Sequence, residues 1–200
     1  MNIRRWFSLA AIAAAGCGGY GAPDEVAFGS VAVTQPAPGA TFHGLQSYYL
    51  DPNVEVWLDG TQQPSIPVPS ATATIIDQRM QGYGYTTKVT TNPPGNTPPA
   101  ADVGLRLAYL KSTYAYYYSG GYCSIYWAYY ACWPGWAYAG SYTTGTVLMA
   151  MIDTKNTPSK GMLWTAGLYA VLYGSSIEDT NRLNAALTRA FDQSTYLSTQ

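Results

Sequence analysis

The sequence predicts an α+β domain in which an antiparallel β-sheet carries two helices packed on one face. Three observations lead to this fold class: an alternating apolar pattern over residues 103–109, two long apolar runs at 146–152 and 162–173, and a helical apolar stripe over 183–191. An apolar stripe on a helix and an apolar face on a sheet each need a partner, and packing the helix on the sheet buries both.

The first strand is expected over residues 41–50, which have the composition of a strand and end at the turn dipeptide Asp51-Pro52. After Gly60 the chain becomes rich in proline, which predicts a further connecting stretch. This part of the chain therefore predicts one strand followed by a connection to the first helix.

The first helix is expected over residues 70–81. Ser70 is placed to cap it, and Gly82 can close it in the left-handed conformation. A short strand should follow near Thr86, and the proline-rich residues 91–100 should form a loop. The apolar positions at helical spacing are Ala73, Ile76 and Met80.

The next strands are predicted by their apolar periodicity. From residue 103 the side chains alternate between two faces, with Val103, Leu105, Leu107 and Tyr109 on one and Gly104, Arg106 and Ala108 on the other. Residues 146–152 are apolar on both faces, which suits a central strand of the sheet. The polar loop 153–161 joins this run to 162–173, so the two are expected to pair as an antiparallel hairpin.

The final helix has the clearest signals. Ser175 and Glu178 have the spacing of a capping box. In this motif the serine side chain accepts a hydrogen bond from the backbone N–H of the glutamate, and the glutamate side chain accepts one from the backbone N–H of the serine. The apolar stripe that follows has the spacing i, i+3, i+4, i+7, i+8 and should pack on the sheet. Its members are Leu183, Ala186, Leu187, Ala190 and Phe191.

The first residues are typical of a bacterial secretion signal. Arg4 and Arg5 precede an apolar core of about ten residues, much shorter than the roughly 20 that a membrane-spanning helix needs. Small residues then lead to Cys17, in an arrangement that resembles the lipobox of bacterial lipoproteins. The resemblance implies that Cys17 carries fatty acids such as palmitate; the alternative is a cleaved secretion signal with an incidental cysteine.

These signals divide the chain into a lipoprotein signal peptide at 1–16, a lipid-anchored flexible tether rich in glycine and proline at 17–40, and a single domain at 41–200. Lipoproteins retained in the inner membrane tend to have Asp after the cysteine, where this chain has Gly18. We therefore expect a protein of the cell envelope, anchored in the outer membrane and facing the periplasm or the cell surface.

The composition excludes nucleic acid as a partner. Removal of the signal would leave eight of the ten Lys and Arg residues against eleven acids, so the mature chain would be slightly acidic. No cluster of basic residues lies outside the signal to neutralise a phosphate backbone.

Three cysteines suit an exported protein if acylation uses Cys17 and leaves Cys123 and Cys132 to form a disulfide. Their spacing closes a small loop, which the chain-entropy model values at about 2–3 kcal/mol. A redox pair or two metal ligands are the alternatives. A redox pair favours C-x-x-C spacing, and a metal site needs further ligands nearby that the sequence lacks, so no metal is expected.

An aromatic segment interrupts the domain at about 112–143. Ten of the 19 tyrosines lie between Tyr114 and Tyr142, and no charged residue occurs from 112 to 152. The segment is interpreted as a packed insertion, as a recognition surface for glycan or protein, or as a contact with the membrane interface. The candidate binding surface consists of Tyr126, Trp127, Tyr129, Tyr130, Trp133 and Trp136.

Several of these segments carry recognisable motifs: the turn at Asp153, the Leu163-Trp164 pair followed by Gly167, and the closing helix with Asn181, Arg182 and Leu183. Together they resemble the bacterial lipoproteins of the domain-of-unknown-function 4136 family. The resemblance covers about residues 41–195, with an interruption at 114–142, and implies the α+β fold described above. It implies no catalytic residue and no cofactor.

The sequence therefore predicts a lipid-anchored envelope protein that binds or organises a partner and is not an enzyme. The single histidine, His43, lies in a predicted strand, and no metalloprotease, phosphate-loop or nucleophile-elbow motif is present. The alternatives are an envelope hydrolase that acts on glycan through dispersed carboxylates, and a purely structural subunit of an envelope complex. Partners are expected to be the membrane, through the lipid, and an envelope protein or glycan.

Overall fold

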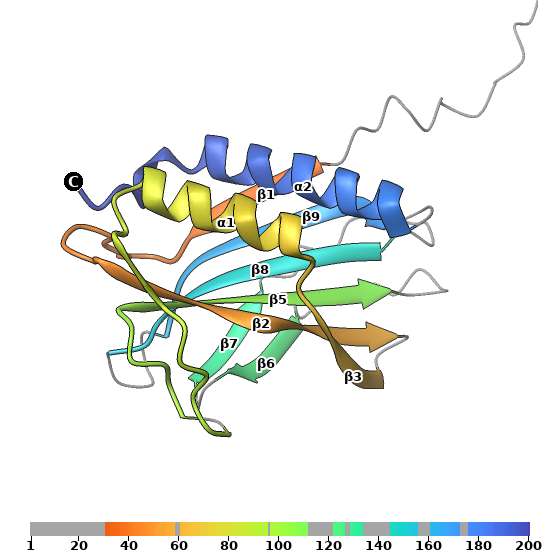
Figure 1. Ribbon diagram of the computed structural model, residues 1–200, viewed down its shortest axis with the longest axis horizontal. Helices are drawn as coiled ribbons and strands as arrows, with labels where there is room; N and C mark the ends of the chain where they lie inside the picture. The colour runs from red at the N-terminus through yellow and green to blue at the C-terminus, as the bar shows by residue number, and fades with distance from the viewer. Residues whose placement is uncertain are drawn as a thin grey trace, which may run out of the picture.

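The computed structural model describes residues 31–58, 61–95, 97–111, 122–126, 129–133, 145–155, 161–172 and 176–200 (Figure 1). The strands are β1 (Val31–Pro36), β2 (Ser47–Leu58), β3 (Thr61–Pro67), β4 (Thr87–Val89), β5 (Val103–Lys111), β6 (Tyr122–Tyr126), β7 (Tyr129–Trp133), β8 (Gly145–Asp153) and β9 (Met162–Leu172). The helices are α1 (Ser70–Gly82), α2 (Ser176–Gln193) and the short 3₁₀ helix η3 (Thr195–Leu197).

The main sheet has seven strands and is mixed, not antiparallel as the sequence predicts. Its order is β1-β9-β8-β5-β2-β3, and β4 pairs with β2 beside β3. Both β5 and β4 run parallel to β2. A parallel pair needs a crossover connection, and α1 provides it between β2 and β5. The two helices lie on one face of the sheet, as predicted (Figure 1).

Two strands occur where the sequence predicts connecting chain. Residues 31–36, part of the expected tether, form β1 and pair antiparallel with β9 at one edge of the sheet. The proline-rich residues 61–67 form β3 at the other edge, antiparallel to β2. Proline is tolerated on edge strands because its missing N–H can face away from the ladder. Composition alone therefore does not predict either of these strands.

The β2 strand continues through the predicted turn at Asp51-Pro52. The pairing of β2 with β5 moves from Leu50–Leu105 to Val54–Leu107, so β2 has two extra residues here. Such a bulge bends a strand without ending it. His43, predicted in a strand, lies instead in an exposed turn before β2.

The first helix begins and ends differently from its prediction. Pro69 occupies the N-cap and no side chain caps the helix, so Ser70 is not its cap. Tyr83 follows the helix in a right-handed conformation, and the residue with positive φ is Gly84, at 100°. Gly82 therefore does not close the helix in the left-handed form.

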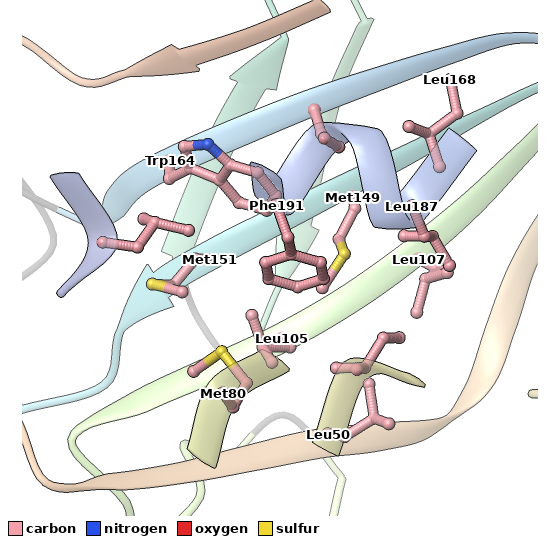
Figure 2. Packing of buried hydrophobic residues seen from close by; sticks show 14 of the residues in the cluster. Leu50, Met80, Leu105, Leu107, Met149, Met151, Trp164, Leu168, Leu187 and Phe191 are labelled. Carbon is pink, nitrogen blue, oxygen red and sulfur yellow. The ribbon is translucent and has the colours of Figure 1, made fainter. Parts of the chain in front are cut away.

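The main core lies between the helices and the sheet (Figure 2). The indole of Trp164 stacks on the ring of Phe191 at a centroid distance of 5.6 Å and donates from Nε1 to Ser194 Oγ at 3.1 Å. All five predicted stripe residues of α2 are buried, which confirms the packing of that helix. The sheet contributes Leu50, Leu105, Leu107, Met149, Met151 and Leu168 to this core.

A second, smaller core occupies the opposite face of the sheet. Every residue of β8 is buried, and the strand lies between β9 and β5, which confirms the prediction of a central strand. Figure 1 places the two-stranded sheet of β6 and β7 on this side, away from the helices. The buried apolar residues of this face are Tyr49, Ala101, Ala108, Leu148, Ala150 and Ile152.

Asp102 ties together the beginnings of β2 and β5. Its Oδ2 accepts hydrogen bonds from Gln46 N, Ser47 N and Ser47 Oγ, each at 2.8 Å. Its Oδ1 forms an ion pair with Lys155 in the β8–β9 connection. One carboxylate thus joins three segments that are distant in sequence.

Candidate functional site

A polar pocket of about 330 Å³ lies on the face of the sheet away from the helices. Strands β2, β3 and β5 and the loop after β4 form its walls. Its polar lining includes Asp51, Asn53, Glu55, Gln62, Asn92 and Arg106.

The bulge in β2 and the alternation of β5 create the centre of this pocket. Arg106 lies between Leu105 and Leu107, whose side chains belong to the helix-side core, so it faces the other way. The extra residues of β2 place Asp51 beside it, with Arg106 Nε 2.9 Å from Asp51 Oδ2. Asp51 Oδ1 accepts from Asn53 N at 2.9 Å, which holds the carboxylate in position.

A second carboxylate stands on the same strand. Glu55 Oε1 accepts from Gln62 Nε2 of β3 at 3.1 Å. The register of β3 against β2 shifts between Val54 and Val56, so β3 has one extra residue there. Both Gln62 and Ser65 therefore line the pocket although three positions separate them.

The loop after β4 closes the pocket from the remaining side. Tyr49 donates its hydroxyl to Asn92 Oδ1 at 2.6 Å, which connects the loop to β2. Burial raises the pKa of Tyr49, and the nearby Asp51 raises it further against the effect of Arg106. The phenol thus remains protonated and acts as a donor to the loop.

The electrostatic balance of the pocket is negative. Asp51 and Glu55 are only 7% and 9% exposed, and one guanidinium, Arg106, opposes their two carboxyl groups. Burial raises the pKa of Asp51 above its ordinary value, although the Arg106 charge and the Asn53 N–H act in the opposite direction. The pocket thus holds buried, oriented carboxyl groups, which are strong hydrogen-bond acceptors when ionised.

Within the described ranges, no group of three or more His, Cys, Asp and Glu residues is arranged to hold a metal ion. The pocket itself contains two carboxyl groups, and one oxygen of each already accepts a hydrogen bond from the protein.

The predicted aromatic surface falls partly on the β6–β7 hairpin. Tyr126 is the last residue of β6, and Tyr129, Tyr130 and Trp133 lie on β7. The remaining two candidates, Trp127 and Trp136, lie outside the described residues, as does Cys17.

The hairpin register pairs aromatic with aromatic and cysteine with cysteine. Tyr122 pairs with Trp133 and Tyr126 with Tyr129, and these positions fall on one face of the hairpin because residues two apart on a strand share a face. Cys123 and Cys132 are direct partners, on the other face. No disulfide is found in the part of the chain that the structure describes.

Sequence reasoning missed the pocket because its residues are far apart in the chain. Asp51 is taken as part of a turn signal, and the scattered acids give no pattern at short spacing. A usable signal does exist: Glu55 and Arg106 each interrupt a strand-like apolar run. A charge buried within a sheet needs a partner, so the two interruptions point to a shared site.

The fold and the site define the class of this protein. It is an α+β domain with two helices on one face of a mixed sheet and a polar, carboxylate-bearing pocket on the other face. The chain belongs to the family described as "Domain of unknown function (DUF4136)", whose profile matches residues 32–194. This confirms the family resemblance noted from the sequence motifs.

A solved structure of the same family shows the same fold, and another solved structure gives a weaker match. A DUF4136 family protein from Bacteroides thetaiotaomicron is 19% identical with a TM-score of 0.57, and the match covers 86% of this chain and 99% of that one. PelC from Paraburkholderia phytofirmans, solved as a dodecamer, is 11% identical with a TM-score of 0.42 over the same shares of the two chains. Among curated proteins, none matches this sequence.

Proposed function

We propose that this chain is a lipid-anchored protein of the bacterial cell envelope, and that its folded domain is a non-enzymatic binding module. The observation that carries the binding role is the shared position of two features. The polar pocket lies on the side of the sheet that the helices leave open, because Arg106 points away from the helix-side core. Figure 1 places the aromatic-rich β6–β7 hairpin on the same side. The partner is an envelope protein or a glycan.

The secretion signal supports the envelope part of the proposal. Residues 1–16 lead to Cys17 in a lipobox-like arrangement, and Gly18 favours the outer membrane. Among the described helices, none is long and apolar enough to cross a bilayer. Several acyl chains on one residue give stable attachment where a single chain gives marginal attachment.

We also propose that Cys123 and Cys132 form a disulfide that closes the hairpin. Their direct pairing across two antiparallel strands supports it, because a disulfide needs neighbouring Cα atoms about 4.4–6.8 Å apart, a separation that directly opposed residues of an antiparallel pair satisfy.

A hydrolase that acts on glycan is the second candidate, and one observation favours it: two carboxyl groups, Asp51 and Glu55, line one pocket, and the pKa of Asp51 is raised. Glycoside hydrolysis needs one carboxyl group to deliver a proton to the leaving group while the other stays ionised. Asp51 is ion-paired with Arg106 and accepts from Asn53 N, so both of its oxygens already have partners. We therefore rank binding ahead of hydrolysis.

Mass spectrometry of the full chain produced in a bacterium tests the anchor. The expected mature protein begins at Cys17 and carries fatty acids, and Cys17→Ser should abolish both the fatty acids and membrane attachment. A mature chain that begins elsewhere, or an unmodified thiol at Cys17, would contradict the anchor.

Crosslinking in intact cells tests the binding module. A photoactivatable amino acid at Trp127 or Trp136 should capture a defined partner, and the same amino acid at Gln81, which is exposed on α1, should not. A second control carries Cys123→Ser and Cys132→Ser, which should reduce capture if the disulfide holds the hairpin. Equal capture at all positions would argue against a recognition surface.

A further inference from the structure

We propose that the pocket bounded by Asp51, Glu55 and Arg106 binds one unit of an uncharged, hydroxyl-rich ligand, namely a sugar residue. The inference rests on the proposed binding function and names the class of ligand for one part of that surface. The source of the sugar is either a free saccharide or a unit of a glycan chain, and the chemistry of recognition is the same for both.

The size and the lining of the pocket set the first limit on its ligand. About 330 Å³ is at the small end of the range for ligand pockets. Most such pockets are lined by apolar side chains with few polar groups, whereas this one is lined chiefly by carboxyl, amide, hydroxyl and guanidinium groups. An apolar ligand would leave these groups without water or partners, which is costly.

The balance of donors and acceptors sets the second limit. Asp51 and Glu55 supply acceptors, Arg106 supplies donors, and the amides of Gln62 and Asn92 supply both. A hydroxyl group donates and accepts at once, so a ligand with several hydroxyl groups can match such a mixed lining.

Charged ligands match the lining less well. Phosphate or a carboxylate would face two carboxyl groups against one guanidinium, and like charges at close range repel. A compact cation would satisfy the carboxyl groups but would leave the donors of Arg106 and of the amides directed at a positive charge.

The walls of the pocket are held in place before any ligand arrives. Asp51 is fixed by Arg106 Nε at 2.9 Å and by Asn53 N at 2.9 Å, and Glu55 is fixed by Gln62 at 3.1 Å. The hydrogen bond from Tyr49 to Asn92 fastens the loop side. A site on strands with its side chains already oriented loses less freedom on binding than a loose one.

Saturation-transfer NMR on the full chain, purified in a detergent without a sugar headgroup, tests the proposal with glucose, N-acetylglucosamine and the tetrasaccharide of each as probes. Inorganic phosphate and spermidine serve as the charged probes, in competition with the sugars. Two variants address the pocket: Ser65→Trp, which fills it from the exposed rim, and Glu55→Gln, which keeps the shape and removes one charge. Thr87→Trp, on the exposed strand β4, is the matched bulky control, and thermal unfolding shows that each variant is folded.

We expect at least one sugar probe to bind wild type and Thr87→Trp equally. The same probe should bind Glu55→Gln about tenfold more weakly, because a charged acceptor is lost. It should show no saturation transfer with Ser65→Trp. A tetrasaccharide that binds more tightly than its monosaccharide indicates a glycan chain; equal binding indicates a free sugar. Absence of transfer from every sugar probe, or unchanged transfer with Ser65→Trp, would overturn the proposal. Displacement of the sugars by phosphate or spermidine at lower concentration would also overturn it.

The sugar-binding experiment and the crosslinking experiment can fail independently of each other. Capture from Trp127 or Trp136 in cells together with no sugar binding in vitro would keep the binding module and remove the sugar. Sugar binding without capture would keep the pocket's ligand and remove the aromatic hairpin as the recognition surface.

Discussion

Two aspartates near the same pair of strands behave in opposite ways. Asp102 and Asp51 are 8% and 7% exposed, and each carboxylate has a cationic partner, Lys155 for the first and Arg106 for the second. Asp102 also accepts three hydrogen bonds from Gln46 and Ser47, whereas Asp51 accepts one, from Asn53 N.

The pKa values of the two groups reflect this difference. Burial acts to raise both. At Asp102, hydrogen bonds from Lys155, Gln46 and Ser47 outweigh burial and hold its pKa well below the ordinary value. At Asp51, burial outweighs Arg106 and Asn53, and the pKa is raised. Hydrogen bonds thus stabilise the ionised form of Asp102 in the folded protein, whereas burial in the pocket destabilises the ionised form of Asp51.

The largest expected effect comes from removal of Asp102. Asp102→Ala deprives Gln46 N and both donors of Ser47 of their acceptor, and hydrogen bonds to a charged group contribute about 1.5–3 kcal/mol. We expect the free energy of unfolding in urea to fall by about 3 kcal/mol. A loss no greater than that of Asp51→Ala would erase the contrast between the two sites.

Acid titration should give opposite slopes for the two groups. The pKa of Asp102 is lowered by folding, so its contribution is complete above the ordinary value of about 3.9 and is lost as the pH falls below it. The pKa of Asp51 is raised, so its ionisation costs stability as the pH rises through about 3.9.

Urea unfolding of wild type, Asp102→Asn and Asp51→Asn between about pH 3 and pH 6 measures these slopes. The stability advantage of wild type over Asp102→Asn should grow with pH, and wild type should lose stability relative to Asp51→Asn over the same range. Slopes of the same sign would show that the two environments are alike.

A smaller effect is expected from Ser47→Ala. Ser47 Oγ donates to Asp102 Oδ2 at 2.8 Å and accepts from Asp102 N at 2.8 Å. Because both backbone N–H bonds to Asp102 Oδ2 survive, we expect a loss of about 1.5 kcal/mol in the free energy of unfolding. Ser65→Ala, in the rim of the pocket, is the matched control and should change stability by less than about 0.5 kcal/mol.

Glu55→Gln is expected to affect stability less than either substitution at the Asp102 site. The amide keeps an oxygen that can accept from Gln62 Nε2, and its volume is nearly the same. Stability should change by less than about 1 kcal/mol, while sugar binding weakens. A large loss of stability would mean that Glu55 belongs to the structural group of carboxylates with Asp102.

Local periodicity predicted much of the fold. The runs that form β5, β8 and β9 and the stripe of α2 have apolar patterns long enough to identify both the element and its buried face. The helix α1 is also predicted within one residue at its end, although Pro69 and Gly84 take the places expected of Ser70 and Gly82.

The arrangement of the strands depends on contacts that sequence patterns do not contain. The parallel pairing of β2 with β5 follows from where the crossover through α1 returns the chain, and edge strands such as β1 and β3 need only one neighbour and little apolar surface. The pocket was missed for a related reason: it depends on a bulge that places Asp51 beside Arg106 across two strands.

The prolines at the margins of the sheet affect how copies of this protein behave when they are crowded. The outer strands β1 and β3 end in Pro36 and Pro67, and β3 has Pro64 in its middle. Each proline removes a backbone N–H that a neighbouring molecule would need in order to continue the ladder. Copies that meet along β1 or β3 would therefore find fewer backbone donors with which to join their sheets into a fibre.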